Sequence, residues 1–147
     1  MFQNILCAVD GSAHALKAAE TASQLAAKLG ASLTFLTVTK ELKVTDQIKR
    51  YMEIENLTGT PQYVLDEMTD EVLSKASHCA KDSGVKTIRT EVKVGHPARV
   101  IVNFAERAGA DLIVIGSRGL GDIGGVLLGS VSHKVSSLAK CACMIIK

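Results

Sequence analysis

The chain has 147 residues and a mass of 15.6 kDa, which suits one compact domain over residues 1–147 and is too short for two ordinary domains. Apolar residues make up 47% of the chain but only three Phe, two Tyr and no Trp are present, so it lacks the aromatic platforms that single-stranded nucleic-acid binders use. The net charge of +2 argues against a dedicated nucleic-acid backbone surface, and no apolar run is long enough for a membrane span.

The N-terminal third predicts a strand, a helix and a second strand. Ile5–Val9 is aliphatic without polar alternation, as in a strand buried on both faces of a parallel sheet. Over residues 13–29 apolar residues recur at spacings of three and four, which predicts a helix with Ser12 as N-cap and Gly30 after its end. The repeating residues are mostly alanines, so this helix is expected to lie close to the sheet. Residues 33–38 predict the second strand.

The middle of the chain is less regular. Within residues 40–59 the apolar residues Val44, Ile48, Met52 and Ile54 indicate a short helix. Thr60-Pro61 is a typical N-cap with proline in the first turn, and the helical pattern that follows ends near Gly84. Residues 87–94 alternate more clearly than the other strand candidates, which favours a strand at the edge of the sheet.

The C-terminal third continues the alternation of helices and strands. Gly95-His96-Pro97 is expected to open a helix that runs to Ala108. Leu112–Ile115 predicts a buried strand, and a glycine-rich stretch over residues 116–129 follows it. The last two expected elements are a helix over residues 130–140 and a strand over residues 142–146.

This alternation predicts an α/β fold: an open, five-stranded parallel sheet with helices on both faces. In such sheets ligands bind beyond the carboxyl ends of the strands, where the strand order reverses. The pattern alone leaves two strand orders open. The order 2-1-3-4-5 reverses between the first and third strands, whereas 3-2-1-4-5 reverses between the first and fourth.

The N-terminus and the four cysteines indicate the cellular compartment in which we expect the protein. The chain starts directly with a strand and shows no basic segment or cleavage site of a signal peptide, so we expect a reducing, cytoplasmic location. Cys7 and Cys79 occupy ordinary positions for small buried side chains. Cys141 and Cys143 lie two residues apart in an expected strand and therefore point to opposite faces. We expect free thiols without a metal or redox role.

The glycine-rich stretch matches two known nucleotide motifs only superficially. Residues 119–124 fit the pattern G-x-G-x-x-G, but the dinucleotide motif belongs after the first strand, with a helix starting inside it. Residues 124–130 resemble a P-loop, but Ser130 stands where the P-loop requires its lysine. Neither motif is therefore expected to function in its usual way.

A third pattern, Gly116-x2-Gly119-x9-Gly129-Ser130, is consistent with a phosphate site. Gly116 ends a buried strand and can let a ligand approach the backbone. Gly119 and Gly129 can direct amides at a phosphate, and Ser130 is expected to cap a helix whose N-terminus favours negative charge. Ser132 adds a hydroxyl group. A plain turn-rich loop is the alternative explanation.

Together these segments resemble the universal stress protein family, specifically its ATP-binding branch. The resemblance spans nearly the whole chain and is carried by Ile5–Ser12, Gly95–Pro97, Asp111–Gly119 and Gly129–Ser132. The last two complete the spacing G-x2-G-x9-G-[ST] that distinguishes ATP-binding members. Ala142 departs from the family, in which many members have proline before the last strand.

The resemblance implies the 3-2-1-4-5 order and a set of site residues. Arg118 stands at a variable, often basic position. Val38 is implied as the backbone contact to adenine, and Asp10 as the acidic group near the ribose and Mg²⁺; an Asx-turn and core packing are the alternative explanations for Asp10 and Val38. The implied ribose and phosphate contacts are Gly116, Gly119, Gly129, Ser130, Val131 and Ser132.

The function expected from this resemblance is an ATP-binding regulatory or stress-response module, with AMP or ADP as alternative ligands and a possible protein partner. Because no P-loop lysine accompanies Asp10, hydrolysis is expected to be very slow at most. A true ATP hydrolase or nucleotidyl transferase is one alternative, and a ligand-free dimeric scaffold is the other. The uncharged residues 142–146 form a sheet edge in the 3-2-1-4-5 order, so we expect a homodimer through them, with higher oligomers possible.

Overall fold

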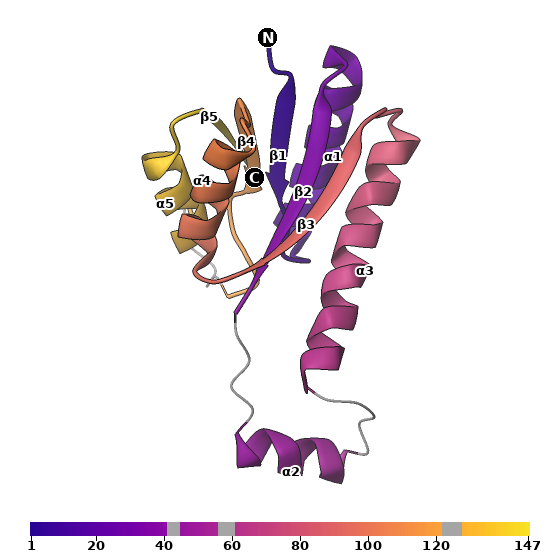
Figure 1. Cartoon of the computed structure of the whole chain (residues 1–147), viewed down its shortest axis with the longest axis vertical. Helices are drawn as coiled ribbons and strands as arrows, with labels where there is room; N and C mark the ends of the chain where they lie inside the picture. Colours follow the sequence, from indigo (N-terminus) through magenta and orange to yellow (C-terminus); the bar gives the residue numbers. More distant parts are fainter. Residues whose placement is uncertain (41–44, 56–60, 122–127) are drawn as a thin grey trace.

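The computed structural model describes residues 1–40, 45–55, 61–121 and 128–147. Its centre is a five-stranded parallel sheet with the order β3-β2-β1-β4-β5 (Figure 1). This is the 3-2-1-4-5 order, so the reversal point lies between β1 and β4. The strands are β1 (Asn4–Ala8), β2 (Ser32–Thr39), β3 (Ile88–Val94), β4 (Leu112–Gly116) and β5 (Ala142–Ile146).

Helices cover both faces of the sheet, as predicted. Side chains of α1 and α3 pack with Ile5, Cys7 and Phe35 in one core cluster. Side chains of α4 and α5 pack with Leu6 and Leu36 in a second cluster on the opposite face. The helices are α1 (Ala13–Leu29), α2 (Asp46–Ile54), α3 (Pro61–Asp82), α4 (Pro97–Arg107) and α5 (Ser130–Leu138).

The helix α1 has the limits that its sequence predicts. The Ser12 hydroxyl accepts a hydrogen bond from the Ala15 amide, and Gly30 ends the helix with a φ of 66°. The alanines at positions 18, 19, 22 and 26 are fully buried against the sheet. Because alanine has only a methyl group, the helix axis can lie close to the strands, which places the start of α1 against the end of β4.

Several predicted boundaries differ from the structure. The last helix ends at Leu138 instead of Lys140, because Ala139 already has an extended backbone. The second strand is longer than predicted by one residue at each end, and β3 begins at Ile88. The predicted short helix is α2, with Thr45 as its N-cap. Val44 and the predicted N-cap Thr60 lie outside the described residues.

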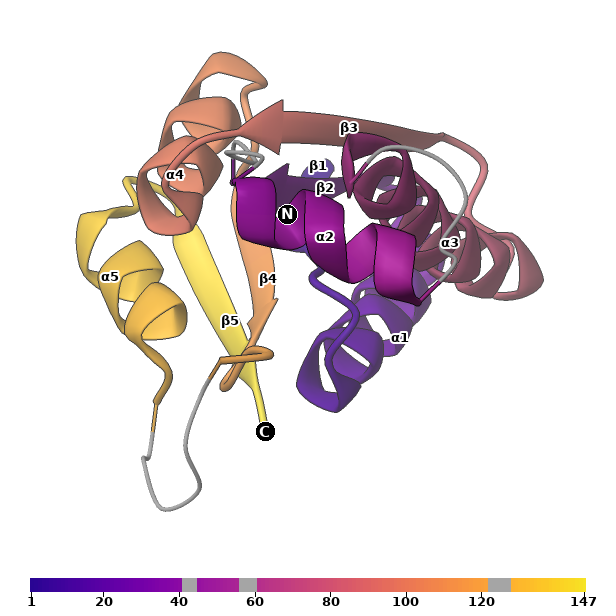
Figure 2. The ribbon, with the colours of Figure 1, turned by 90° about the horizontal axis from the view of Figure 1, so that it is seen from below.

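The helix α2 lies apart from the rest of the fold. Figure 1 shows it beneath the carboxyl ends of the strands, and Figure 2 shows it crossing below the sheet toward α3. None of its nine residues is buried. None of the helices within the described ranges combines the length and the apolar character needed to cross a membrane.

Candidate functional site

A cavity of about 370 Å³ opens at the carboxyl ends of β1, β2 and β4, which is the reversal point of the sheet. We call it the carboxyl-end cavity. Of the nine positions proposed from the sequence, all but Gly129 line it. The lining residues are Ala8, Val9, Asp10, Ala15, Leu36, Val38, Lys40, Pro97, Ile101, Ile115, Gly116, Arg118, Gly119, Leu120, Gly121, Ser130, Val131 and Ser132.

Asp10 joins the end of β1 to the glycine-rich loop. One carboxylate oxygen accepts the Ser12 amide at 2.9 Å, which is the Asx-turn considered from the sequence. The other oxygen accepts the Leu120 amide at 3.2 Å. Asp10 therefore fixes the start of α1 and the loop after β4 at once, and its carboxylate remains at the cavity wall.

Gly116 is a glycine for a reason that the sequence does not reveal. A Cβ atom at this position would lie 2.8 Å from the backbone carbon of His14 in α1. The missing side chain of Gly116 therefore primarily lets the helix α1 approach the end of β4. It also leaves room for a ligand in the cavity. His14 is held at the same place by a 3.1 Å contact between its Nδ1 atom and the Ser117 hydroxyl.

The start of α5 borders the cavity, but its capping differs from the prediction. Gly129 is the N-cap, and Ser130 is the first helical residue, so Ser130 does not cap the helix as expected. The Gly129 amide donates to the Ser117 carbonyl at 2.7 Å, which closes the loop at its base. This amide is thus engaged within the protein and does not face the cavity as the sequence suggested.

Ser132 also has a structural hydrogen bond. Its buried hydroxyl donates to the Gly116 carbonyl at 2.5 Å, which ties α5 to the end of β4. A hydroxyl has one proton to donate, so Ser132 can donate to a ligand only if this bond breaks. The amides of the first helical turn, at Ser130, Val131 and Ser132, have no acceptor within the helix and lie at the cavity wall.

The cavity has a charged part and an apolar part. Among the described residues, Arg118 and Lys40 bring positive charge to its wall and Asp10 brings a carboxylate. Lys40 carries no signal of this role in the sequence, although its place one residue beyond β2 follows once the strand order is known. The apolar wall is likewise not recognisable from the sequence, because its residues look like ordinary core positions. That wall includes Leu36, Pro97, Ile101 and Ile115.

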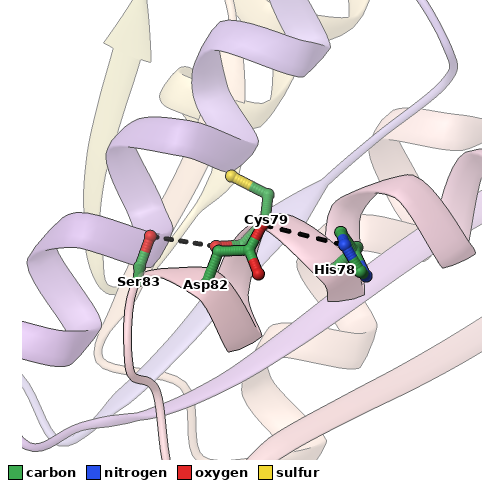
Figure 3. A network of polar contacts seen from close by, with 4 residues as sticks. All are labelled: His78, Cys79, Asp82 and Ser83. Carbon is green, nitrogen blue, oxygen red and sulfur yellow. Dashed lines mark hydrogen bonds and ion pairs between the residues drawn. The ribbon is translucent and has the colours of Figure 1, made fainter.

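His78, Cys79 and their neighbours form a small polar cluster at the end of α3. Among the described residues, no group of three or more His, Cys, Asp or Glu side chains is arranged to hold a metal ion. Figure 3 shows His78 directed at Asp82, a 3.8 Å pair between exposed side chains one helical turn apart, while Ser83 donates to the Cys79 carbonyl. These contacts belong to the end of α3.

The cysteines are unpaired thiols. Burial raises the pKa of the Cys7 thiol, with a smaller contribution from Cys79. Burial likewise raises the pKa values of Cys141 and Cys143. A raised pKa keeps a cysteine in the unreactive thiol form.

Comparison with known proteins places the whole chain among relatives of one kind. The family model described as "Universal stress protein family" matches residues 1–147. Universal stress protein YxiE of Bacillus subtilis is 36% identical over 154 residues that cover all of both chains. A crystal structure of a universal stress protein in complex with cAMP has a TM-score of 0.73 at 30% identity, covering 99% of this chain and 96% of that one. UspA from Lactobacillus plantarum has the same TM-score at 26% identity, with 99% and 98% covered.

Proposed function

The chain belongs to the universal stress protein family, and we propose that it binds an adenine nucleotide, ATP in the first place, as a nucleotide-dependent regulatory module. The observation that carries the proposal is the carboxyl-end cavity, which brings Asp10, the glycine-rich loop and the start of α5 to the reversal point of the sheet. A related protein at 30% identity is in complex with cAMP, which supports an adenine nucleotide as the ligand class.

The phosphates would lie at the start of α5. Amides of the first helical turn, including those of Ser130 and Val131, favour an anion at that place. Arg118 and Lys40 add positive charge at the same cavity wall. Gly129 contributes by holding the loop closed through its bond to Ser117.

The base would lie in the apolar part of the cavity. Leu36, Ile101 and Ile115 provide a nonpolar environment for a purine ring. Val38 is partly buried at the end of β2 and packs against the cluster on the same face. In the proposal its backbone contacts the adenine edge, which gives the base its hydrogen-bonding specificity.

The carboxylate of Asp10 is a suitable ligand for a nucleotide-bound Mg²⁺. Magnesium sites in nucleotide-binding proteins commonly combine one or two carboxylates with water and substrate phosphates. Asp10 offers one carboxylate at the cavity wall, with each oxygen already accepting one amide and retaining further acceptor capacity. In the proposal the ion enters with the phosphates, because one carboxylate alone does not make a protein cage for it.

Hydrolysis is proposed to be very slow at most. Phosphoryl transfer needs charge neutralisation at the γ-phosphate and a group that orients the attacking water. Ser130 stands where a P-loop has its lysine. The carboxyl-end cavity includes Asp10 as its acidic side chain among the described residues, and this carboxylate already holds the Ser12 and Leu120 amides.

We also propose a homodimer in which the β5 strands of two copies pair. β5 lies at one edge of the sheet, and its residues are all uncharged. Its outer backbone donors and acceptors would gain partners in a second strand. The cytoplasmic location and a protein partner remain predictions from the sequence.

The ligand itself provides the test of the proposed function. The protein is purified without added nucleotide and denatured, and the released small molecules are identified by mass spectrometry; an adenine nucleotide is expected. Apo protein is then assayed for phosphate release from Mg-ATP, with an expected rate far below the ~1 s⁻¹ of slow ordinary enzymes. A faster rate that Asp10→Asn abolishes would establish an ATP hydrolase instead. If no nucleotide is released and added ATP does not bind, the proposal is wrong and the ligand-free dimeric scaffold is the remaining function.

A further inference from the structure

A second hollow of about 470 Å³ lies beside the carboxyl-end cavity, between α1 and α3. We call it the α1–α3 groove. Leu16, Met68 and Leu120 line it, and these large apolar side chains are 49%, 58% and 71% exposed. A contiguous apolar surface of this kind is usually covered in a soluble protein.

The helix α2 has an apolar face that is only partly covered, because Ile48 and Met52 are half-buried. Ile48 and Met52 lie four residues apart and share one face, and Tyr51 borders them. None of the nine residues of this helix is buried. Isolated helices shorter than about 12–15 residues are marginal in water, so α2 needs tertiary contacts to persist.

The chain is long enough to bring α2 to the groove. Four residues separate Lys40 from Thr45, and five separate Glu55 from Pro61; extended chain covers about 3.3–3.6 Å per residue. Met68 lies seven residues into α3, roughly 10 Å along its axis, and α2 is itself roughly 13 Å long. An antiparallel arrangement of α2 on α3 therefore places Ile48 and Met52 near Met68.

The charges at the groove match those beside the apolar face of α2. Lys49 borders that face, one position after Ile48. Glu71 lines the groove and Glu67 lies one turn before it on α3. Glu71 already forms a 2.8 Å ion pair with Lys75, which lowers the pKa of its carboxyl group. A second cation can join such an exposed carboxylate, since it has two acceptor oxygens.

We propose that α2 closes onto the α1–α3 groove, with Ile48 and Met52 covering Leu16, Met68 and Leu120. Closure also reaches the carboxyl-end cavity, because Asp10 and Leu120 line both hollows. The Leu120 amide donates to Asp10, so fixing the Leu120 side chain steadies this link between the loop and β1. This contact couples closure of α2 to nucleotide binding, an inference that rests on the proposed function.

Disulfide trapping tests the closure. Met52→Cys and Met68→Cys are combined in a background with Cys79→Ser, Cys141→Ser and Cys143→Ser, and the nucleotide-free protein is oxidised. All five positions are at least partly exposed, so the fold is expected to persist, which circular dichroism checks. A rapid disulfide within one chain, detected by peptide mass, is the expected result. The matched control combines Glu53→Cys, which lies outside the apolar face of α2, with Met68→Cys in the same background. This pair should cross-link at least about tenfold more slowly than the first pair.

Equal rates for the two pairs would overturn the proposal, and so would a disulfide found only between two chains, which would assign the groove to a second copy. The oxidation is then repeated with saturating Mg-ATP. Faster trapping supports the coupling to the nucleotide site, whereas an unchanged rate in protein shown to bind ATP overturns the coupling. If the disulfide forms rapidly in protein that does not bind ATP, the closure of α2 is supported and only the proposed function is contradicted.

Discussion

Gly116 shows how one missing side chain positions two elements. Its α-carbon faces the first turn of α1, and the nearest atoms to an added Cβ are the backbone carbonyl group and the Cβ atom of His14. Backbone atoms cannot move aside as a flexible side chain does. The carbonyl of the same residue accepts the hydroxyl of Ser132, so α1 and α5 both depend on this end of β4.

Gly116→Ala is therefore expected to lower the free energy of unfolding by about 1–3 kcal/mol, as overpacking in a tight interior does. Urea denaturation measures the difference. Gly121→Ala is the matched control, because an added Cβ there meets no atom within 4 Å. If both variants unfold at the same urea concentration, α1 is not held against β4 as the structure shows.

Cys7 makes the stability depend on alkaline pH. Burial first, and Cys79 to a lesser extent, raise the pKa of its thiol in the folded protein, whereas in the unfolded chain a cysteine ionises near ~8.5. The stabilising effect of the neutral thiol is complete below the unfolded pKa and is lost as the pH rises toward the folded one. Above about pH 8.5 the loss in the free energy of unfolding approaches about 1.4 kcal/mol per pH unit.

Urea unfolding of the wild type and Cys7→Ala at about pH 8 and about pH 10 isolates this contribution. The variant is expected to be less stable at the lower pH because of its cavity, but to lose less stability between the two. Other ionising groups are shared by both proteins, so parallel pH profiles would show that the Cys7 thiol ionises in the folded state as well.

At the scale of whole elements, the two edges of the sheet differ in a way that matters for assembly. β3 carries Arg89, Glu91 and Lys93, and charged side chains of this kind discourage pairing with another strand. β5 is Ala-Cys-Met-Ile-Ile and carries none. Its side chains are partly buried except for that of Ala142, which is exposed. A twofold axis beside β5 would let two copies pair antiparallel.

Ile145→Lys is expected to convert a dimer to a monomer, because a charge at the pairing edge must lose water when the strands meet. Light scattering gives the mass at tens of micromolar protein. Ile145 also packs against the α4 and α5 side chains, so circular dichroism must first show a folded variant. Val92→Lys on β3 is the control and should leave the dimer intact. A wild type that is already monomeric would contradict the proposed assembly.

The elements also show what the sequence can and cannot predict. Local signals such as the Ser12 cap, the alanine face of α1 and the aliphatic β1 predicted their elements nearly to the residue. The capping of α5 was mispredicted, because the bond from the Gly129 amide to the Ser117 carbonyl depends on how a loop closes in space. Contacts between distant segments leave no periodic signal.

At the scale of the molecule, the site exists only because the strand order brings separate segments together. Asp10 follows β1, Lys40 follows β2, and Arg118 follows β4, so their nearness requires β2, β1 and β4 to be neighbours. Periodicity predicted the parallel sheet but left two orders open, and the family resemblance selected the one observed. Most of the predicted site residues line the cavity for that reason, whereas the apolar wall is recognisable only in the folded chain.

Calorimetric titration with Mg-ATP of the wild type, Gly119→Val and the control Thr90→Val tests the central claim most directly. The wild type should bind one nucleotide per chain. A valine side chain at Gly119 occupies the space where a phosphate would meet the loop backbone, so this variant should remain folded and lose about tenfold or more in affinity, about 1.4 kcal/mol at least. Thr90→Val, at an exposed position of β3 outside the residues that line the cavity, should bind as the wild type does. Unchanged affinity in a folded Gly119→Val variant, or no heat of binding in the wild type, would contradict a nucleotide site in the carboxyl-end cavity.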